Sequence, residues 1–272
     1  MARLSLLIML GMAACSDQPV PVSEPASPAT SSPDVGVPVI PPARDTTNPA
    51  APALPDFGSI SDVPTMKRTF YEYLHPMVVA ENGRILARRQ RLQNQRRHPE
   101  KMDGEDVDWL RHLSEEYRLE APLASLENYP VDHLDRLLAR VDVVPAALAL
   151  AQAAIESGWG RSRFARLGNN IYGEWCFTPG CGIVPRDRNP GAVHEIADFE
   201  TPAGSIRSYL RNLNTHPAYA DWRALRRQQR DASAPLDAAE LAAGLTNYSE
   251  LREEYVERVR AVIRQNAHLM PR

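Results

Sequence analysis

The sequence predicts a mainly helical α+β domain, in which several helices surround one strongly apolar helix and a small β-hairpin forms a lobe. Three observations predict this class. Apolar residues recur at spacings of three and four over most of the chain after Gly58. Residues 146–155 are almost entirely alanine and leucine, which favour a buried helix. Turn signals and short apolar runs replace the helical spacing between Trp175 and Phe199.

Residues 1–15 have the composition of a targeting segment and do not belong to the domain. The apolar stretch 4–14 is shorter than the ~20 residues that a membrane-spanning helix needs. Small residues before Cys15 resemble the bacterial lipobox, in which the cysteine is lipidated and becomes the mature N-terminus. Ser16 after that cysteine implies sorting to the outer membrane. We therefore expect an outer-membrane lipoprotein that faces the periplasm of a Gram-negative bacterium; the alternative is an ordinary cleaved signal.

Residues 16–58 are rich in proline, alanine, serine, valine and threonine and contain almost no aromatic residues. Such a segment cannot bury enough apolar surface to offset its ordering entropy, so we expect a disordered linker. At about 3.1 Å per residue it could reach on the order of 100 Å from a membrane anchor. The folded domain is then expected over 59–272. The formal net charge of −3 gives no reason to expect a nucleic-acid partner.

The N-terminal half of the domain is expected to contain four or five helices. The first begins near Met66, and Pro76 is expected to kink or interrupt it. A basic helix then continues toward Arg97. Further helices are expected at about 107–119 and 131–141. The arginines of the basic helix are typical of a solvated helix face, although they could also meet anionic wall polymers.

The apolar central helix is expected to begin at Pro145 and to end at Gly158 and Gly160, because proline suits the first helical turn and glycine the end. Two short runs, 182–185 and 192–199, are then expected to pair as the β-hairpin. The remaining helices are expected at about 202–214, 237–243 and 250–266. The last has its acidic residues early and its arginines late, as the helix dipole favours.

Glu156 breaks a local rule, because a carboxylate at the C-terminal end of a helix opposes the helix dipole. It also follows the most apolar helix in the chain, so burial should raise its pKa. A carboxylic acid that stays protonated near neutral pH is what glycoside hydrolysis needs to protonate a leaving oxygen. Glu156 is therefore the candidate catalytic acid; the alternative is an exposed glutamate on the last helical turn.

The residues around Glu156 support this interpretation. Residues 153–160 read Ala-Ala-Ile-Glu-Ser-Gly-Trp-Gly, and residues 169–173 read Asn-Asn-Ile-Tyr-Gly. Together they resemble the glucosaminidase domains of glycoside hydrolase family seventy-three. Further stretches resemble the Bax-type bacterial branch of this group: 80–87, 175–182, 212–214 and 248–256. The resemblance extends over about residues 66–266 and implies a lysozyme-like helical fold with a small β-lobe and a cleft for aminosugar chains.

The resemblance also implies roles for individual residues, with peptidoglycan glycan strands as the substrate and no cofactor or metal. Glu156 matches the catalytic acid, and Tyr248 matches a cleft tyrosine whose hydroxyl could orient a water or the acetamido group. Asn170, Tyr172 and Trp175 would line the sugar site, because aromatic faces and amides suit sugar rings. Alternatively, the three aromatic residues are packing residues.

A second catalytic carboxylate is harder to identify from the sequence. Some family members carry a functional glutamate on the first hairpin strand, but 181–185 contains no acid. The candidates are Asp187, Glu195 and Asp198, of which Glu195 is chosen as the second catalytic carboxylate; alternatively it pairs with an arginine on the lobe surface. If no second acid faces the cleft, the acetamido group of the substrate could assist the reaction.

Cys176 and Cys181 are expected to form a disulfide, because the expected compartment is oxidising and a short loop with Pro-Gly can turn back on itself. The alternative is a pair of free thiols. His194 and Glu195 begin like the zinc-binding His-Glu-x-x-His motif, but position 198 is aspartate and the segment is predicted as a strand. A zinc site is therefore not expected there.

The sequence thus predicts a peptidoglycan hydrolase that cleaves the glycan strand, as an N-acetylglucosaminidase. One alternative is a lytic transglycosylase, which would leave anhydro-muramyl ends. Another is a wall-binding lipoprotein without catalytic activity. We also hypothesise that the arginine-rich stretch 59–97 covers part of the cleft or binds a regulatory protein, since a free hydrolase would endanger its own cell wall.

Overall fold

The computed structural model describes residues 54–120, 130–186, 188–189 and 191–271. The expected signal segment with Cys15, and the linker residues before Leu54, lie outside these described ranges. Among the helices of the described ranges, none combines the length and the apolar composition that crossing a membrane requires.

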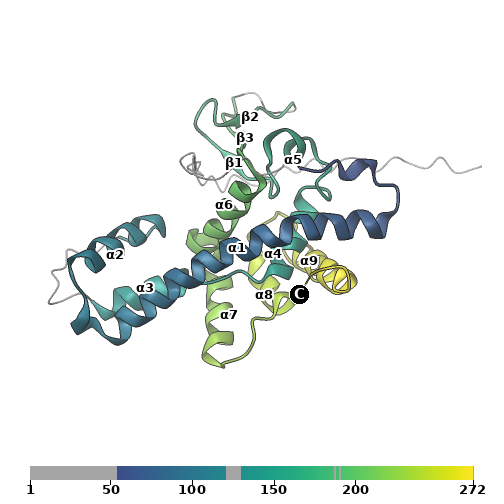
Figure 1. The fold of residues 1–272 in the computed structure, drawn as a ribbon. Coiled ribbons are helices and arrows are strands. Elements are labelled where there is room, and N and C mark those ends of the chain that lie inside the picture. The colour runs from purple at the N-terminus through teal and green to yellow at the C-terminus, as the bar shows by residue number, and fades with distance from the viewer. Residues whose placement is uncertain (1–53, 121–129, 187, 190, 272) are drawn as a thin grey trace, which may run out of the picture. The chain divides into compact units, whose positions relative to one another are not determined.

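The predicted class, a mainly helical, lysozyme-like α+β domain with a small β-lobe, is confirmed (Figure 1). The elements are η1 Phe57–Ser59, α1 Val63–Arg97, η2 Pro99–Lys101, α2 Gly104–Glu116, α3 Val131–Arg140, α4 Ala146–Glu156, α5 Arg163–Gly168, β1 Trp175–Cys176, β2 Gly182–Ile183, β3 Glu195–Ala197, α6 Pro202–Thr215, η4 Pro217–Tyr219, α7 Ala220–Asp231, α8 Ala238–Leu241, η5 Ala242–Leu245 and α9 Glu253–Asn266, where η marks a 3-10 helix.

Helix α1 is one continuous helix of 35 residues that packs against α3, α4 and α6. Asp62 caps its start by accepting a hydrogen bond from the Thr65 backbone N–H at 2.9 Å. The prediction that Pro76 interrupts this helix is wrong. Pro76 lies on the exposed face, where water can solvate the carbonyl that loses its partner, while apolar positions on both sides are buried in the core.

The arginine-rich part of α1 is tied to neighbouring helices. Arg89 donates to the carbonyls of Leu138 and Val141 at the end of α3. Arg91 and Arg96 form ion pairs with acidic residues of α2 and α3. The opposite face of α1 lies in the hydrophobic core. Deletion of residues 59–97 would therefore remove a core helix and unfold the domain. A deletion variant is for this reason no test of whether the segment covers part of the cleft or binds a regulatory protein.

Residues 141–144 belong to the loop that connects α3 to α4, and polar side chains from α1 and α7 hold them in place. Asn82 of α1 donates to the Val144 carbonyl at 2.8 Å and accepts from its N–H at 3.1 Å. Arg226 of α7 is 1% exposed and donates to the carbonyls of Asp142 and Val143. These bonds fix where α4 begins, and therefore where it ends.

Helix α4 has the predicted alanine- and leucine-rich sequence and is buried along most of its length. The Ser157 hydroxyl donates to the Ala153 carbonyl at 2.6 Å and accepts from the Gly160 N–H at 2.7 Å, which turns the chain away from the helix axis. Trp159 has a φ of +61°, a conformation that is uncommon for a residue other than glycine. The turn directly after Glu156 is therefore strained and held by its surroundings.

The Phe57 ring packs against this turn at Gly160. The sequence assigns Phe57 to the linker, but its ring is buried and packs edge to face on Phe70 with 5.3 Å between ring centroids. A Cβ atom placed on Gly160 would lie 2.6 Å from the Phe57 ring. The first described segment of the chain is thus packed against the turn that follows Glu156.

We expect Gly160→Ala to destabilise the protein by about 2–4 kcal/mol, since a φ of +73° strains alanine and the Phe57 ring must also move. Gly158→Ala is a matched control. Gly158 also has a positive φ, of +56°, but its added Cβ would meet no atom within 4 Å. Its loss should be about 1–2 kcal/mol. Urea unfolding of both variants checks this, and equal losses would contradict the steric role of Phe57.

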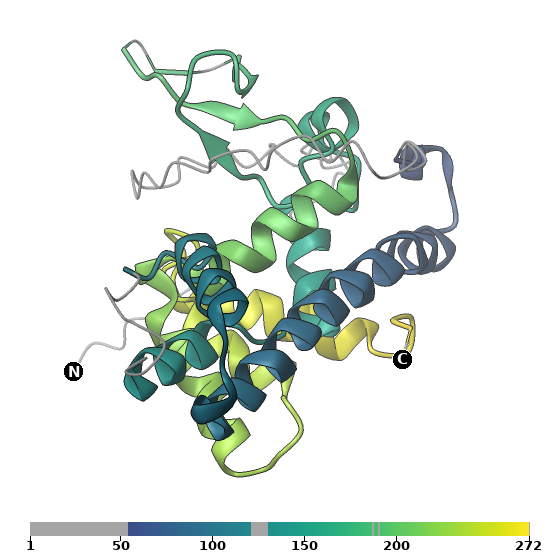
Figure 2. The same cartoon turned by 60° about the vertical axis from the view of Figure 1, so that its left-hand side comes forward.

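The β-lobe has three strands in the order β1-β3-β2, with β3 antiparallel to both neighbours. Figure 2 shows these strands at the top, beyond α6. The predicted hairpin corresponds to β2 and β3, and β1 was not predicted because it is only two residues long. The predicted disulfide between Cys176 and Cys181 is confirmed, with 6.2 Å between the Cα atoms. It closes the short connection from β1 to β2.

Candidate active site

Glu156 is the last residue of α4 and is half-buried. Burial raises the pKa of its carboxyl to about 7, against the opposing effects of a hydrogen bond from Tyr255 and the charge of Arg258. The direction and the main cause agree with the sequence prediction. Near neutral pH this carboxyl is therefore divided between its protonated and its ionised form.

A chain of buried hydrogen bonds holds the Glu156 carboxyl. The Tyr255 hydroxyl of α9 donates to Glu156 Oε1 at 2.6 Å. Gln152 Nε2, one turn earlier on α4, donates to the Tyr255 oxygen at 3.0 Å, and the Tyr209 hydroxyl of α6 donates to Gln152 Oε1 at 2.5 Å. Gln152 and Glu156 share a helix face because they are four residues apart. Three helices thus fix the orientation of one carboxyl.

Tyr248, the predicted cleft tyrosine, lies beside this chain. Its ring stacks on the Tyr255 ring with 5.3 Å between centroids. Its hydroxyl donates to the Tyr172 carbonyl at 3.4 Å, a long bond. The hydroxyl that donates to Glu156 belongs to Tyr255 of α9, which the sequence analysis did not single out. The role of Tyr248 in catalysis stays a prediction.

In the wild type the Tyr255 hydroxyl lowers the pKa of Glu156. Tyr255→Phe should therefore raise that pKa and move the alkaline limb of the pH–activity profile to higher pH. The variant also leaves Gln152 Nε2 without its acceptor. Tyr248→Phe is the comparison, since the Tyr248 hydroxyl donates to the Tyr172 carbonyl, whereas the Tyr255 hydroxyl donates to Glu156. An unchanged alkaline limb in Tyr255→Phe would show that the Tyr255 hydroxyl does not affect the pKa of Glu156.

Asn170 and Tyr172, two of the predicted sugar-site residues, are buried. The Asn170 amide donates to the carbonyls of Glu174 and Ala197, each at 2.8 Å, and its oxygen accepts from the Glu174 N–H at 3.0 Å. The Tyr172 ring stacks in parallel on the Tyr209 ring at 3.8 Å. Both residues hold the segment 170–175 in place, and their contact with a sugar stays a prediction.

Trp175, the third predicted sugar-site residue, is on β1 at the edge of the lobe. Its side chain is half-buried, and its ring stacks in parallel on the His194 ring with 4.2 Å between centroids. Of the three residues, Trp175 therefore offers a partly exposed aromatic surface of the kind that packs against sugar rings.

Glu195, the predicted second carboxylate, is buried on the central strand β3. Its two oxygens accept the backbone N–H groups of Gly180 at 3.1 Å and Gly182 at 2.8 Å, and these bonds lower its pKa. It therefore ties the disulfide loop to the sheet, and its catalytic assignment stays a prediction. Of the other candidates, Asp198 is exposed and Asp187 lies outside the described residues.

The Glu195 carboxylate and the sulfurs of Cys176 and Cys181 lie within 4.8 Å of one another, a grouping that could hold a metal. The two sulfurs are bonded to each other, however, so they cannot act as thiolate ligands. In this oxidised form the group offers one carboxylate, which is also bound by two N–H groups. Its chemistry therefore does not fit a zinc ion.

Glu174 was missed by the sequence analysis. It is 8% exposed, and burial raises its pKa to about 8. Its Oε1 accepts from the Ser208 hydroxyl at 3.2 Å, and its Oε2 has no hydrogen-bond partner among the described residues. Its place in the sequence, between the predicted sugar-site residues Tyr172 and Trp175, could have identified it as a candidate.

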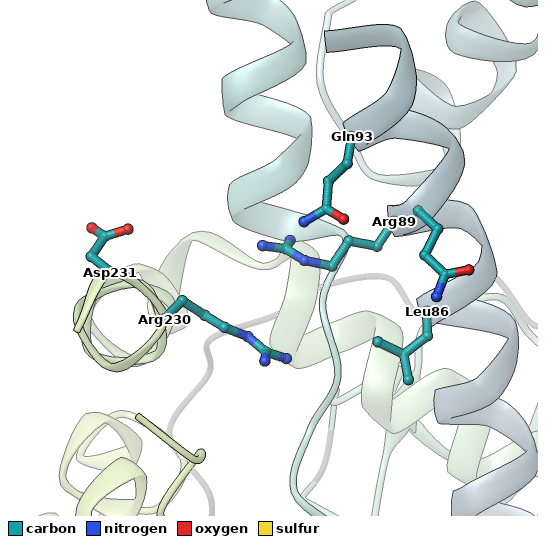
Figure 3. A pocket seen from close by; sticks show the side chains of 6 residues that line it. Leu86, Arg89, Gln93, Arg230 and Asp231 are labelled. Carbon is teal, nitrogen blue, oxygen red and sulfur yellow. The ribbon is translucent and has the colours of Figure 1, made fainter. Parts of the chain in front are cut away.

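A pocket between α1 and α7 is lined by Leu86, Arg89, Gln90, Gln93, Arg230 and Asp231. None of these is a predicted site residue. In Figure 3, Arg89 and Arg230 point toward one another from the two helices. Both arginines form ion pairs with the buried Asp142. This pocket therefore belongs to the packing of α1 on α7.

Comparison with known proteins gives two matches. Residues 131–268 match the family model "Glucosaminidase", described as mannosyl-glycoprotein endo-beta-N-acetylglucosaminidase. The match spans α3 to α9 and includes Glu156 and Tyr255. The chain is also 29% identical over 218 residues to "Protein bax" of Escherichia coli (strain K12), across 80% of this chain and 76% of that protein. No solved structure matches the chain significantly.

Proposed function

The chain belongs to the glucosaminidase family, and on this premise we propose that it cleaves the glycan strands of peptidoglycan as an N-acetylglucosaminidase, with Glu156 as the general acid. Family membership supports a glycosidase that acts on peptidoglycan. The choice of bond and of acid goes beyond the family match.

The state of Glu156 is the observation that carries this proposal. A general acid works best when its pKa is near the working pH, and burial raises the pKa of Glu156 to about 7. The carboxyl is also held in one orientation by the Tyr255 hydroxyl. A fixed and partly protonated carboxyl can deliver a proton to the oxygen of a glycosidic bond as that bond breaks.

The second half of the reaction is proposed to use the acetamido group of the substrate. Both oxygens of Glu195 are bound by backbone N–H groups, and Asp198 is exposed, so neither side chain has the setting expected of a nucleophile. Substrate-assisted glycosidases need no second protein nucleophile. Tyr248, beside Tyr255, is then the candidate to orient the acetamido group or the attacking water.

Mass spectrometry of purified peptidoglycan digested by the protein without residues 1–15 tests the proposal. We expect fragments that end in reducing N-acetylglucosamine. Reducing N-acetylmuramic acid would identify a muramidase, and anhydro-muramyl ends would identify a lytic transglycosylase. No fragments from a folded preparation would favour a wall-binding protein without catalytic activity.

We further propose that lipidation of Cys15 anchors the protein in the outer membrane facing the periplasm. The small residues before Cys15 and the serine after it support this location. Labelled palmitate should be incorporated into the wild-type chain in cells and not into Cys15→Ser, and equal labelling of both would refute the anchor.

A further inference from the structure

Glu174 occupies an unusual position, because its backbone is fixed while its carboxyl is buried with few partners. The Asn170 amide binds both the N–H and the carbonyl of Glu174, at 3.0 and 2.8 Å. Its side chain meets α6, where the Ser208 hydroxyl reaches Oε1 at 3.2 Å. Trp175, with its partly exposed ring, is the next residue. The buried carboxyl therefore belongs to the residue that precedes Trp175, a predicted sugar-site residue.

Glu195 in the same lobe shows what an ionised buried carboxylate requires. Each oxygen of Glu195 accepts a backbone N–H, and the pKa of Glu195 is lowered. Glu174 has a single hydroxyl on Oε1 and no partner on Oε2 among the described residues. Burial of an oxygen without a hydrogen-bond partner costs little free energy when the carboxyl is uncharged and much more when the carboxyl is ionised.

The charged and titratable groups around Glu174 come from several elements. Arg211 of α6 and Arg118, just after α2, favour its ionised form but do not outweigh burial. The phenols of Tyr172, Tyr209 and Tyr219 also face it, since its charge raises their pKa. None of these groups gives Glu174 a pair of hydrogen bonds like those that Glu195 accepts from two backbone N–H groups.

We propose that Glu174 is a positioning residue of the sugar site: its carboxyl stays buried against α6 while it is uncharged, and loss of its proton makes burial costly, displaces Trp175 and weakens glycan binding. The identity of the ligand rests on the proposed function. Ionisation would draw the carboxyl toward solvent and strain the hydrogen bonds between Asn170 and the Glu174 backbone, so the neighbouring Trp175 would shift. Glu156 is on a different element, so the chemical step is not the one affected.

Glycan binding should be measured in the Glu156→Gln background, where the ligand is not cleaved, with a soluble N-acetylglucosamine oligosaccharide and calorimetry. From pH 7 to pH 9 the affinity should fall about tenfold, because only about a tenth of a group with a pKa of about 8 stays protonated at pH 9. The double variant with Glu174→Gln should keep its affinity within about twofold. Equal losses in the two proteins, or no loss in either, would overturn the proposal.

Tryptophan fluorescence of the glycan-free protein gives a second readout. The emission of the wild type should change between pH 7 and pH 9, and the change should disappear in Glu174→Gln and in Trp175→Phe. Ser208→Ala should move the change to higher pH, because the Ser208 hydroxyl lowers the pKa of Glu174. Glu200→Gln, at an exposed carboxyl of the same lobe, should leave it in place.

The two readouts separate the two proposals. If no oligosaccharide binds at any pH while the fluorescence change depends on Glu174, the proposed function fails and the positioning role of Glu174 on Trp175 stands. A fluorescence change that persists in Glu174→Gln, or that is absent from the wild type, overturns the role of Glu174 whatever the protein binds.

Discussion

Replacement of Glu156 by glutamine is expected to lower the rate of glycan cleavage at pH 7 by about a thousandfold, within the range that a general acid contributes. Glutamine has the same shape and keeps an oxygen for the Tyr255 hydroxyl, which lies 2.6 Å from Glu156 Oε1. It cannot give up a proton to the leaving oxygen. The release of reducing ends from purified peptidoglycan measures the effect.

Glu253→Gln is the matched control, because Glu253 is an exposed carboxyl in the first turn of α9. It should leave the rate unchanged. Undiminished cleavage by Glu156→Gln would refute the assignment of the acid. If neither the wild type nor the variant cleaves and both bind the wall equally, the protein is a binding protein.

The same substitution should change stability with pH. The pKa of Glu156 is about 7 in the folded chain, above its ordinary value of 4.5. Between these values the folded state holds a proton that the unfolded state has lost, so rising pH destabilises the wild type across this window. Glu156→Gln should therefore melt at a higher temperature than the wild type at pH 8, and the difference should shrink toward pH 4. A constant difference would contradict the raised pKa.

Arg226→Met is expected to destabilise the protein by about 3–5 kcal/mol, the range seen when one partner of a buried ionic network is removed. The Arg226 side chain is fully buried and lies over the Trp222 ring. It donates to the Asn214 side chain and to four backbone carbonyls, those of Ala139, Arg140, Asp142 and Val143. Methionine can fill the volume but leaves these acceptors without donors.

Arg227→Met provides the control, since Arg227 is the next residue on α7 and is exposed. Urea unfolding should show a loss of less than about 0.5 kcal/mol for this variant. A similar loss in both variants would mean that the buried guanidinium does not hold the 141–144 loop. A large loss in Arg226→Met alone would show that the buried guanidinium stabilises the loop before α4.

Patterns that act within one element were readable from the sequence. Helix α4 was predicted because its alanines and leucines favour a buried helix, and Glu156 stood out because it breaks the charge pattern at the end of that helix. The disulfide was predicted because its two cysteines are close in the chain. These features need no knowledge of how the helices dock.

Features that depend on docking were missed. The hydrogen bond from Tyr255 to Glu156 was not predicted, because it depends on how α9 docks against α4. Helix α7 was not predicted because its buried face consists of Trp222, Arg223 and Arg226, and arginines normally indicate solvent. The buried backbone carbonyls of the loop and of the end of α3 explain why Arg226 belongs there.

The packing of Phe57 against the turn after Glu156 has a consequence for the rigidity of that turn. Phe57 lies close to the start of the described chain, and its ring fills the space where a side chain on Gly160 would stand. Loss of this ring would therefore leave an unfilled space beside the turn four residues beyond Glu156. The first residues of the described chain thus stiffen the turn that supports the Glu156 side chain.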